Sequence, residues 1–385
     1  MQQSRERVVV AMSGGVDSSV AAALLVERGY DVVGLMLRLW SEPGDFPQAR
    51  RDNRCCTRDQ MLDAAFIARR LKIPFEVIDA QEVFKSVVVD GFIDGYARGI
   101  TPNPCLACNR HIRFTYLLDE ALKRGASYLA TGHYAQITRD QRGRFELRKG
   151  ADPGKDQSYV LSVLNQAQLS HALFPVGGYT KPQVREIATR FGLPVASKSE
   201  SMDLCFIADG DYRRFLGTIK PDTVKHGEII LGDGTIVGRH VGLANYTIGQ
   251  RKGLGISWHE PLYVIEKDAI SNTLVVGTRS ELGATRFLAG PMSWVSGDVP
   301  PTPFSAEVKI RYTAAPVPAT VTPQDDGSAL FQVAIPLPDV TPGQGAVIYD
   351  GDRVVGMGLI EQGLTPNRST RTQKTRDLLT PQEHH

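Results

Sequence analysis

Apolar and polar positions follow two different rhythms over the first two hundred residues. Short continuous apolar runs, which are typical of buried strands, occupy residues 7–12, 31–39, 75–78 and 128–131. Segments with apolar residues on one helical face run from Val16 to Gly29 and at 58–71, 82–96, 112–123 and 181–191. Strands alternating with amphipathic helices predict a parallel sheet covered on both faces. Residues 135–148 predict a hairpin around Arg142-Gly143.

Glycine and β-forming residues dominate the chain from Gly227 onward. Gly232-Asp233-Gly234 predicts a hairpin turn, and further β-runs lie at 306–312, 329–335 and 346–349. This pattern predicts a barrel-like all-β part. We therefore predict an α/β protein with a parallel-sheet domain over 1–208, a small central β-rich domain over 209–277, a C-terminal β-barrel over 278–364 and a disordered tail over 365–385.

Composition adds limits rather than a function. The 385 residues are 42% hydrophobic and 22% charged, and the net charge of +2 is too small to argue for a nucleic-acid partner by itself. No apolar run approaches the roughly 20 residues of a membrane span, and residues 1–7 are polar, so a cytoplasmic protein is expected. Five cysteines without a secretion signal favour reactive thiols or metal ligands over a disulfide scaffold.

A glycine-rich loop separates the first predicted strand from the first predicted helix. It runs from Ser13 to Ser19 (SGGVDSS). Its two glycines and the helix start behind them would expose backbone N–H groups to an anion. No lysine follows the glycines, so it is not a Walker A loop. Asp17 is unexpected beside phosphates unless it holds Mg²⁺. An aspartate capping a helix would explain Asp17 alone, but the whole motif resembles the pyrophosphatase-type PP loop of ATP enzymes.

The cysteines fall into three groups. Cys105 and Cys108 lie among polar residues and prolines before a predicted helix, which favours reactive thiols. Cys205 lies between Leu204 and Phe206, where a buried apolar role and a reactive role are equally compatible with the sequence. Cys55 and Cys56 precede a helix, and we interpret them as structural or incidental thiols.

At these cysteine segments the chain resembles the tRNA-specific 2-thiouridylases. The resemblance rests on TPNPCLACNR at 101–110 and DLCFI at 203–207, and it extends to TGHYA at 131–135, KDQSY at 155–159, YTIGQRKGLG at 246–255 and PGQ at 342–344. It covers residues 7 to about 362, with separate motifs in the same order. It implies an adenine nucleotide alpha hydrolase-like PP-loop domain and a sulfurtransferase that acts on the wobble uridine of tRNA, U34.

The resemblance also implies a mechanism. ATP would adenylate the C2 oxygen of uridine, because that oxygen is a poor leaving group until it carries a phosphate. Cys205 would carry a persulfide received from a sulfur-donor protein. Cys108 would attack that persulfide, so that sulfur is transferred and a disulfide forms that must later be reduced. The products are 2-thiouridine, AMP and pyrophosphate, and ATP and Mg²⁺ are the expected cofactors.

The resemblance assigns the remaining site residues. Those that would bind ATP are Ala11, Met12, Ser13, Gly14, Gly15, Val16, Asp17, Ser18, Met36 and Gly132, with Asp17 also the candidate Mg²⁺ ligand. Those that would contact the target base or tRNA are Asn103, Pro104, Cys105, His133, Lys155, Asp156, Gln157, Arg311, Tyr312 and Gln344. Charged pairs such as Arg251-Lys252 are commonly solvated surface, but here they could extend a local basic path for tRNA.

Cys105 departs from many members of the family, which carry aspartate there. With Cys108 it forms a Cys-x-x-Cys pair, and with the distant Cys205 it could supply three ligands to a 4Fe–4S cluster whose fourth iron stays open. The other interpretation is a persulfide pair with one spare thiol, which we favour. Structural zinc fits less well because no fourth ligand is evident.

Two other functions are compatible with parts of the sequence. A PP-loop ligase or amidating enzyme would explain the loop but not the spaced cysteines. A non-catalytic tRNA-binding or sulfur-relay protein would explain the cysteines but not an intact phosphate loop. The sequence does not identify the sulfur donor or the tRNA isoacceptors, and it leaves the oligomeric state open, although a monomer is expected.

Overall fold

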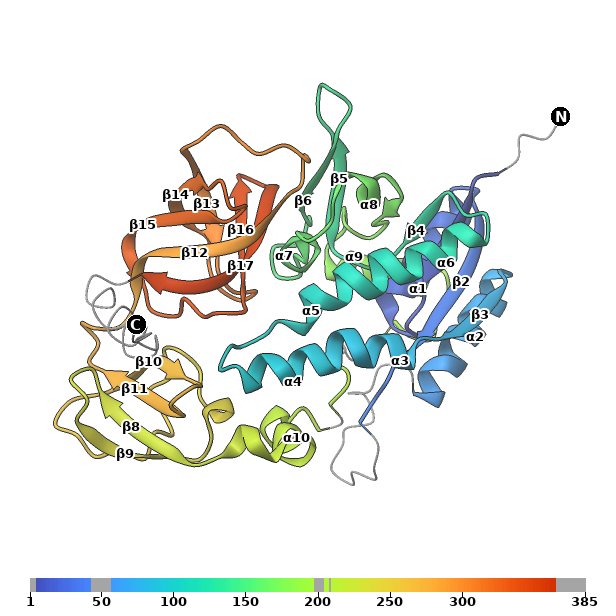
Figure 1. Cartoon of the computed structure of the whole chain (residues 1–385). Coiled ribbons are helices and arrows are strands. Elements are labelled where there is room, and N and C mark those ends of the chain that lie inside the picture. Colours follow the sequence, from blue (N-terminus) through green and yellow to red (C-terminus); the bar gives the residue numbers. More distant parts are fainter. Residues whose placement is uncertain (1–4, 43–56, 197–203, 208, 365–385) are drawn as a thin grey trace, which may run out of the picture.

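The computed structural model describes residues 5–42, 57–196, 204–207 and 209–364. Within them, a parallel sheet has the strand order β3-β2-β1-β4-β7 (Figure 1). Its strands are β1 (Arg7–Ala11), β2 (Asp31–Arg38), β3 (Phe75–Asp79), β4 (Tyr128–Ala130) and β7 (Ala172–Leu173). The four strands expected from apolar runs are therefore confirmed. Strand β7 was not predicted, because two residues are too few to form a pattern.

Helices cover both faces of this sheet, as the alternating pattern predicts. Val8 and Val10 of β1 pack in one apolar cluster with α1 (Val16–Glu27), α2 (Arg58–Leu71) and α9 (Lys181–Arg190). Val9 points to the opposite face, where two long helices pack. The first consists of α3 (Gln81–Phe84), η2 (Lys85–Val89) and α4 (Asp90–Ala97), and the second of α5 (Pro104–Ala107), η3 (Cys108–Leu117) and α6 (Leu118–Lys123).

The second long helix begins earlier than the sequence suggests. A start at Ile112 was expected, but the helix begins at Pro104, so the placement of Cys105 and Cys108 in a preceding loop is wrong. Two local features explain the difference. Asn103 caps the helix, because its Oδ1 accepts from the backbone N of Cys105 at 3.1 Å and of Leu106 at 3.3 Å. Pro104 occupies the first turn, where its fixed φ and missing N–H are tolerated.

The predicted hairpin at 135–148 is confirmed as β5 (Ala135–Arg139) and β6 (Phe145–Lys149), but it belongs to another sheet. It extends the β-barrel, whose sheet has the order β12-β15-β14-β13-β16-β17-β6-β5 within the described residues and closes through a β12–β17 pairing. The barrel strands are β12 (Ala284–Trp294), β13 (Phe304–Lys309), β14 (Val317–Pro323), β15 (Ala329–Leu337), β16 (Gly345–Asp350) and β17 (Arg353–Leu364). The hairpin therefore joins the first and last parts of the chain.

A smaller sheet lies below the barrel in Figure 1. It has the order β10-β11-β8-β9 and comprises β8 (Gly227–Leu231), β9 (Ile236–His240), β10 (Tyr263–Asp268) and β11 (Thr273–Gly277). The turn expected at Gly232 to Gly234 joins β8 to β9, and Gly234 has a φ of +97°. Helix α10 (Tyr212–Ile219) precedes this sheet. None of the helices described is long and apolar enough to cross a membrane.

Lys267 of β10 is partly buried, and its ammonium group lies buried against α4. Its Nζ lies 5.8 Å from the ring centroid of Tyr96 and has no hydrogen-bond acceptor within the described residues. Burial lowers the pKa of Lys267 from 10.5 to about 8. At pH 7 the folded protein holds a poorly solvated ammonium, which lowers the free energy of unfolding. This destabilisation disappears as the pH rises from about 8 to 10.5, because the folded state loses the proton before the unfolded state does.

Lys267→Met should therefore stabilise the protein at pH 7 by about 1–3 kcal/mol and by much less at pH 10.5. Denaturant unfolding at the two pH values measures the difference. The exposed Lys252 is the matched control, and Lys252→Met should change stability by less than about 0.5 kcal/mol at either pH. A Lys267→Met protein that is less stable than the wild type at pH 7 would show that the ammonium contributes favourably.

Candidate active site

The glycine-rich loop connects β1 to α1 in a shape that its own serines hold. The Ser18 hydroxyl accepts from the backbone N of Ser13 at 3.2 Å and donates to the carbonyl of Gly15 at 3.2 Å. Gly14 has a φ of +70°, and a Cβ there would collide with the carbonyl of Gln60 in α2. Gly15 is the N-cap of α1 and has no side chain to cap it. The first backbone N–H groups of α1 are therefore available to an anion.

Asp17 in the first turn of α1 forms a partly buried ion pair that the sequence did not predict. Lys181 Nζ donates to its two carboxylate oxygens at 2.7 and 2.9 Å, and the Tyr134 hydroxyl donates to Oδ1 at 2.6 Å. Lys181 is only 8% exposed. It lies in the first turn of α9, where a cation opposes the helix dipole. That unfavourable position is the one sequence signal that could have identified it.

The end of β4 lies directly against the phosphate loop. A Cβ on Gly132 would lie 2.6 Å from the backbone N of Ser18 and 2.7 Å from the carbonyl carbon of Asp17, so only glycine fits. Met12 and Met36 are 3% and 1% exposed and pack in the core beneath the loop. The side chains of these two residues therefore support the site, and only their backbone atoms could meet a nucleotide. The sheet thus brings the loop, Gly132 and Met36 together at the carboxyl ends of its strands.

His133 lies beside Gly132 but is buried. Arg113 Nη1 lies 3.3 Å from His133 Nε2, and Thr131 Oγ1 lies 2.7 Å from Nδ1. The guanidinium of Arg113 can only donate, so His133 Nε2 accepts this hydrogen bond. The ring proton is therefore on Nδ1, which donates to Thr131 Oγ1. Burial, and then the charge of Arg113, holds the pKa of His133 well below its usual range. His133 is therefore a neutral acceptor that orients Arg113, which lies on the helix that carries Cys108.

The cysteines pack against one apolar cluster. Cys108 is buried within it, and the partly buried Cys205 packs against the same cluster. Cys105 lies one turn before Cys108 and is also partly buried. The described residues contain no group of three His, Cys, Asp or Glu side chains placed to hold a metal ion. The expectations for Cys55 and Cys56 lie outside the described residues.

A buried ion pair holds the segment that carries Cys205. The backbone N of Glu42 donates to the carbonyl of Phe206 at 3.1 Å. The Glu42 side chain is 3% exposed and accepts two hydrogen bonds from Arg214, each 2.7 Å long. Arg214 also donates to Asp209 at 2.6 Å, and its pKa is raised by Glu42 and then by Asp209.

Glu42→Ala should lower the free energy of unfolding by roughly 2–3 kcal/mol, because two charge-assisted hydrogen bonds are lost from a buried position. The Cys205 thiol should also react faster with an alkylating reagent, because its segment loses an anchor. Asp209→Ala is the control, since Asp209 binds the same arginine from a more exposed position and should cost less. Equal stabilities for Glu42→Ala and the wild type would exclude this anchoring role.

The segment expected to contact tRNA at 155–157 supports the nucleotide site. Gln157 Oε1 accepts from the backbone N of Tyr134 at 3.0 Å. Asp156 Oδ1 accepts from the backbone N of Gly150 at 3.0 Å and of Ser158 at 3.1 Å. The side chains of Asp156 and Gln157 therefore form hydrogen bonds to backbone groups of the protein itself.

The barrel forms hydrogen bonds with the segment that precedes the cysteine helix, which is the long helix of α5, η3 and α6 that carries Cys105 and Cys108. Gln344 Nε2 donates to the carbonyl of Thr101 at 2.9 Å, and the backbone N of Thr101 donates to the carbonyl of Pro342 at 2.9 Å. The barrel therefore fixes the start of the Asn103–Cys105 segment that the resemblance assigns to the target base. Gln344 does this through its side chain.

Arg311 joins the barrel to the central sheet region. Its Nη2 donates to Thr341 Oγ1 at 2.6 Å and to the carbonyl of Ile248 at 3.4 Å, and its Nε lies 3.1 Å from Asp339. Tyr312 beside it is 38% exposed, and its ring lies edge-on to Tyr159 with centroids 6.1 Å apart. Arg311 therefore has structural partners, while Tyr312 presents an aromatic face at the surface.

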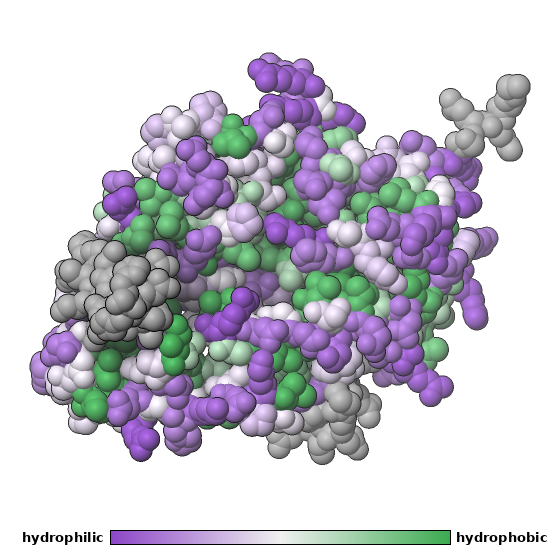
Figure 2. All heavy atoms as spheres, in the orientation of Figure 1, coloured by the Kyte–Doolittle hydropathy of each residue, from purple (hydrophilic) through white to green (hydrophobic). Residues whose placement is uncertain are grey.

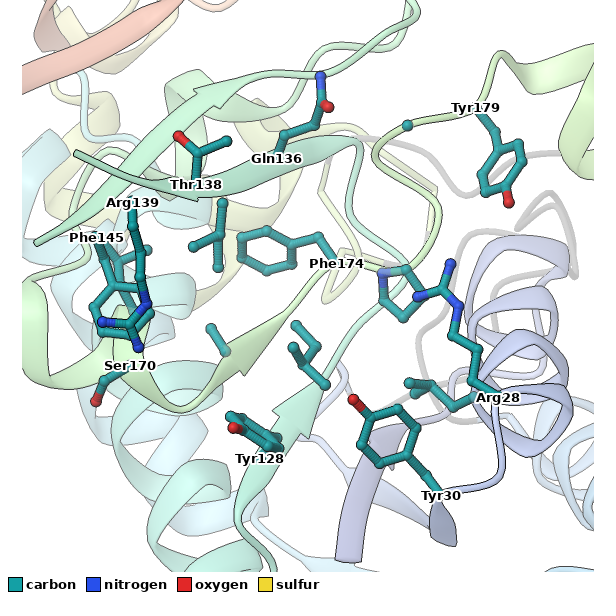
Figure 3. Close-up of a pocket in the computed structure, with 17 residues that line it drawn as sticks. Arg28, Tyr30, Tyr128, Gln136, Thr138, Arg139, Phe145, Ser170, Phe174 and Tyr179 are labelled. Carbon is teal, nitrogen blue, oxygen red and sulfur yellow. The ribbon is translucent and has the colours of Figure 1, made fainter. Parts of the chain in front are cut away.

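A hollow of about 800 Å³ lies away from these residues. Figure 3 shows Tyr30 and Arg28 from the end of α1, Tyr128 from β4 and Phe174 from the segment after β7 around it. Strands β5 and β7, which are the edges of their sheets, both line it. None of the predicted site residues does, so this hollow is separate from the candidate active site.

Three family models match successive parts of the chain. The tRNA methyl transferase HUP domain matches residues 6–209, the tRNA methyl transferase PRC-barrel domain matches 213–278, and the aminomethyltransferase beta-barrel domain matches 284–360. A parallel-sheet domain followed by a small domain and a C-terminal barrel is thus confirmed.

Similar proteins are named for one activity. The tRNA-specific 2-thiouridylase MnmA of Geobacter metallireducens is 46% identical over 94% of this chain and 99% of its own length. That of Magnetococcus marinus is 46% identical over 92% of this chain and 99% of its own. A solved structure of the U34-tRNA thiolase NcsA from Methanococcus maripaludis with its [4Fe-4S] cluster is 17% identical, covers 57% of this chain and 68% of that one, and has a TM-score of 0.32.

Proposed function

The chain belongs to the family of the tRNA-specific 2-thiouridylases, and from this premise we propose that it replaces the C2 oxygen of the wobble uridine of tRNA, U34, with sulfur at the expense of ATP. The observation that carries the proposal is the junction at the end of β4. There Gly132 lies against the phosphate loop, and His133 holds Arg113 of the helix that bears Cys108. Gly132, His133 and Arg113 thereby connect the proposed ATP site to the helix that carries the thiol.

The phosphate loop would bind the phosphates of ATP through the N-terminus of α1. Lys181 supplies, from α9, the positive charge that a Walker A loop carries in its own sequence. The C2 oxygen of uridine would attack the α-phosphorus, and pyrophosphate would leave. A carboxylate has more acceptor sites than the hydrogen bonds from Lys181 and Tyr134 use, so Asp17 fits an Mg²⁺ ligand. When bound, Mg²⁺ would supply charge neutralisation at the phosphates.

Sulfur would reach the base through Cys205 and Cys108. A donor protein would leave a persulfide on Cys205. The Cys108 thiolate would attack the inner sulfur of that persulfide, forming a Cys108–Cys205 disulfide and releasing hydrosulfide. The hydrosulfide would add to C2, and AMP would leave with the former C2 oxygen. A dithiol reductant would then restore both thiols. The packing of both cysteines on one cluster supports this pairing.

A 4Fe–4S cluster on Cys105, Cys108 and Cys205 is less well supported. No three His, Cys, Asp or Glu side chains of the described residues are placed to hold a metal ion, and we derive no step through a cluster. Cys105 would instead stand beside the target base, where the barrel fixes the preceding segment through Gln344 and Thr101.

The tRNA would lie over the cysteine helix and the barrel. Lys155 and the exposed Tyr312 are the residues most suited to touch it, through a phosphate and through stacking. The face in Figure 2 carries polar side chains over most of its area, with apolar residues in separate groups. We propose a cytoplasmic monomer served by a separate persulfide donor.

Nucleoside analysis of tRNA from cells lacking the protein tests this function. The account predicts that 2-thiouridine derivatives disappear and that the wild-type gene restores them. Unchanged 2-thiouridine together with loss of an amide- or lysine-modified nucleoside would favour the ligating enzyme. Restoration of 2-thiouridine by a variant with a destroyed phosphate loop would favour a sulfur-relay protein.

A further inference from the structure

Asn109, the residue after Cys108, has a buried donor without an acceptor. It is 0% exposed, and its Oδ1 accepts from Arg113 Nη1 at 3.1 Å. Its Nδ2 has no hydrogen-bond partner within the described residues. Rotating the amide would place Nδ2 against the guanidinium, which only donates, so the orientation is fixed by Arg113. A buried amide donor left unsatisfied costs about 1–3 kcal/mol, and such groups are rare in folded proteins.

The surroundings hold Asn109 in place rather than relieve this cost. Arg113 is itself held by the neutral His133, so the oxygen of Asn109 is occupied and the nitrogen is directed elsewhere. His133 follows Gly132, which contacts the first turn of α1 behind the phosphate loop. Asn109 directly follows Cys108 and is therefore connected to the first turn of α1 through Arg113, His133 and Gly132.

We propose that Nδ2 of Asn109 donates a hydrogen bond to a non-bridging oxygen of the α-phosphoryl group, which ATP transfers to the C2 oxygen of uridine and which later leaves within AMP. This inference rests on the proposed function. A phosphoryl oxygen is favoured over a uracil carbonyl because Asn109 is paired with a cation, Arg113, whose other partner, His133, follows the glycine that packs against the first turn of α1. Negative charge moves onto that oxygen in both steps, so a donor placed beforehand lowers both barriers. Asn109 gains and loses no atoms.

Two variants separate this role from a structural one. Asn109→Leu has similar volume and removes both the unsatisfied donor and the oxygen that accepts from Arg113. Asn109→Asp keeps an acceptor for Arg113 but replaces the donor with a negative charge. The measurements are the thermal unfolding temperature and single-turnover pyrophosphate release with substrate tRNA, as a function of ATP concentration.

We expect pyrophosphate release to fall by about 10²–10³-fold in both variants, with the maximal rate affected more than the ATP concentration needed. The unfolding temperature of Asn109→Asp should stay close to that of the wild type, because the carboxylate still accepts from Arg113 and Nδ2 has no hydrogen bond to lose. Release within threefold of wild type in Asn109→Leu would overturn the inference. So would parallel loss of activity and several degrees of unfolding temperature in both variants, which is the result of a structural role. Absence of tRNA-dependent release in the wild type would instead contradict the proposed function.

Discussion

Asp17→Asn should abolish pyrophosphate release in the presence of substrate tRNA while leaving a folded protein. Asparagine can still accept from Tyr134 and Lys181 but removes the charge that Lys181 neutralises and that Mg²⁺ would bind. The Lys181 ammonium would then stand uncompensated beside the loop, where it would hold phosphate in place of its carboxylate partner. We expect the Asn variant to bind ATP at least as tightly as the wild type and to release pyrophosphate about 10²-fold more slowly, or slower still.

Asp17→Ala is a poorer probe than it looks from the sequence. An exposed helix-start residue costs about 1 kcal/mol when replaced by alanine. Asp17 instead pairs with a lysine that is 8% exposed, and because the Asp17 side chain is itself 32% exposed we expect its removal to cost about 1–3 kcal/mol. The double variant Asp17→Ala with Lys181→Met should recover much of that stability but none of the activity. Stopped-flow pyrophosphate detection and denaturant unfolding measure the two effects, and wild-type turnover in Asp17→Asn would refute the phosphate-loop assignment.

Cys108→Ser and Cys205→Ser should each stop thiolation completely and leave tRNA binding near normal. Both changes remove a nucleophile and no phosphate contact, so the binding constant and its salt dependence should not move. Cys205→Ser should carry no persulfide. Cys108→Ser should retain a Cys205 persulfide, because the attack that releases its outer sulfur is lost. Mass spectrometry of the intact proteins after incubation with a persulfide donor distinguishes these two states.

Cys105→Asp is the matched control for both serine variants. If the persulfide pair performs the chemistry, Cys105→Asp stays active and iron-free, since aspartate is the residue that the resemblance leads us to expect there. If a cluster performs it, anaerobically reconstituted Cys105→Ala and Cys105→Asp lose iron, visible absorbance and activity together. Restoration of 2-thiouridine in a deletion strain by either serine variant would show that the residue concerned is not catalytic.

The parallel sheet and the phosphate loop could be predicted because their signals are local. Continuous apolar runs such as 7–12 mark strands buried on both faces, and the serines and glycines that shape the loop are neighbours in sequence. The hairpin turn at Gly232 to Gly234 was predictable for the same reason, since glycine tolerates the positive φ that the turn needs.

Contacts between distant segments could not be predicted in this way. Lys181 and Asp17 are 164 residues apart in the sequence, and Gln344 and Thr101 are 243 residues apart. The hydrophobic periodicity of the sequence does not indicate either contact. The start of the cysteine helix at Pro104 was missed because Asn103 and prolines are equally typical of loops. The orphan donor of Asn109 is visible only once burial and partners are known.

One measurement tests the central claim most directly. Purified protein, ATP, a persulfide donor and an unmodified tRNA are allowed one turnover, and the tRNA is digested and analysed by mass spectrometry alongside AMP. The account predicts one 2-thiouridine at the wobble position for each AMP formed, and neither product with a tRNA that carries cytidine there. AMP without 2-thiouridine, or sulfur at another position, would contradict it.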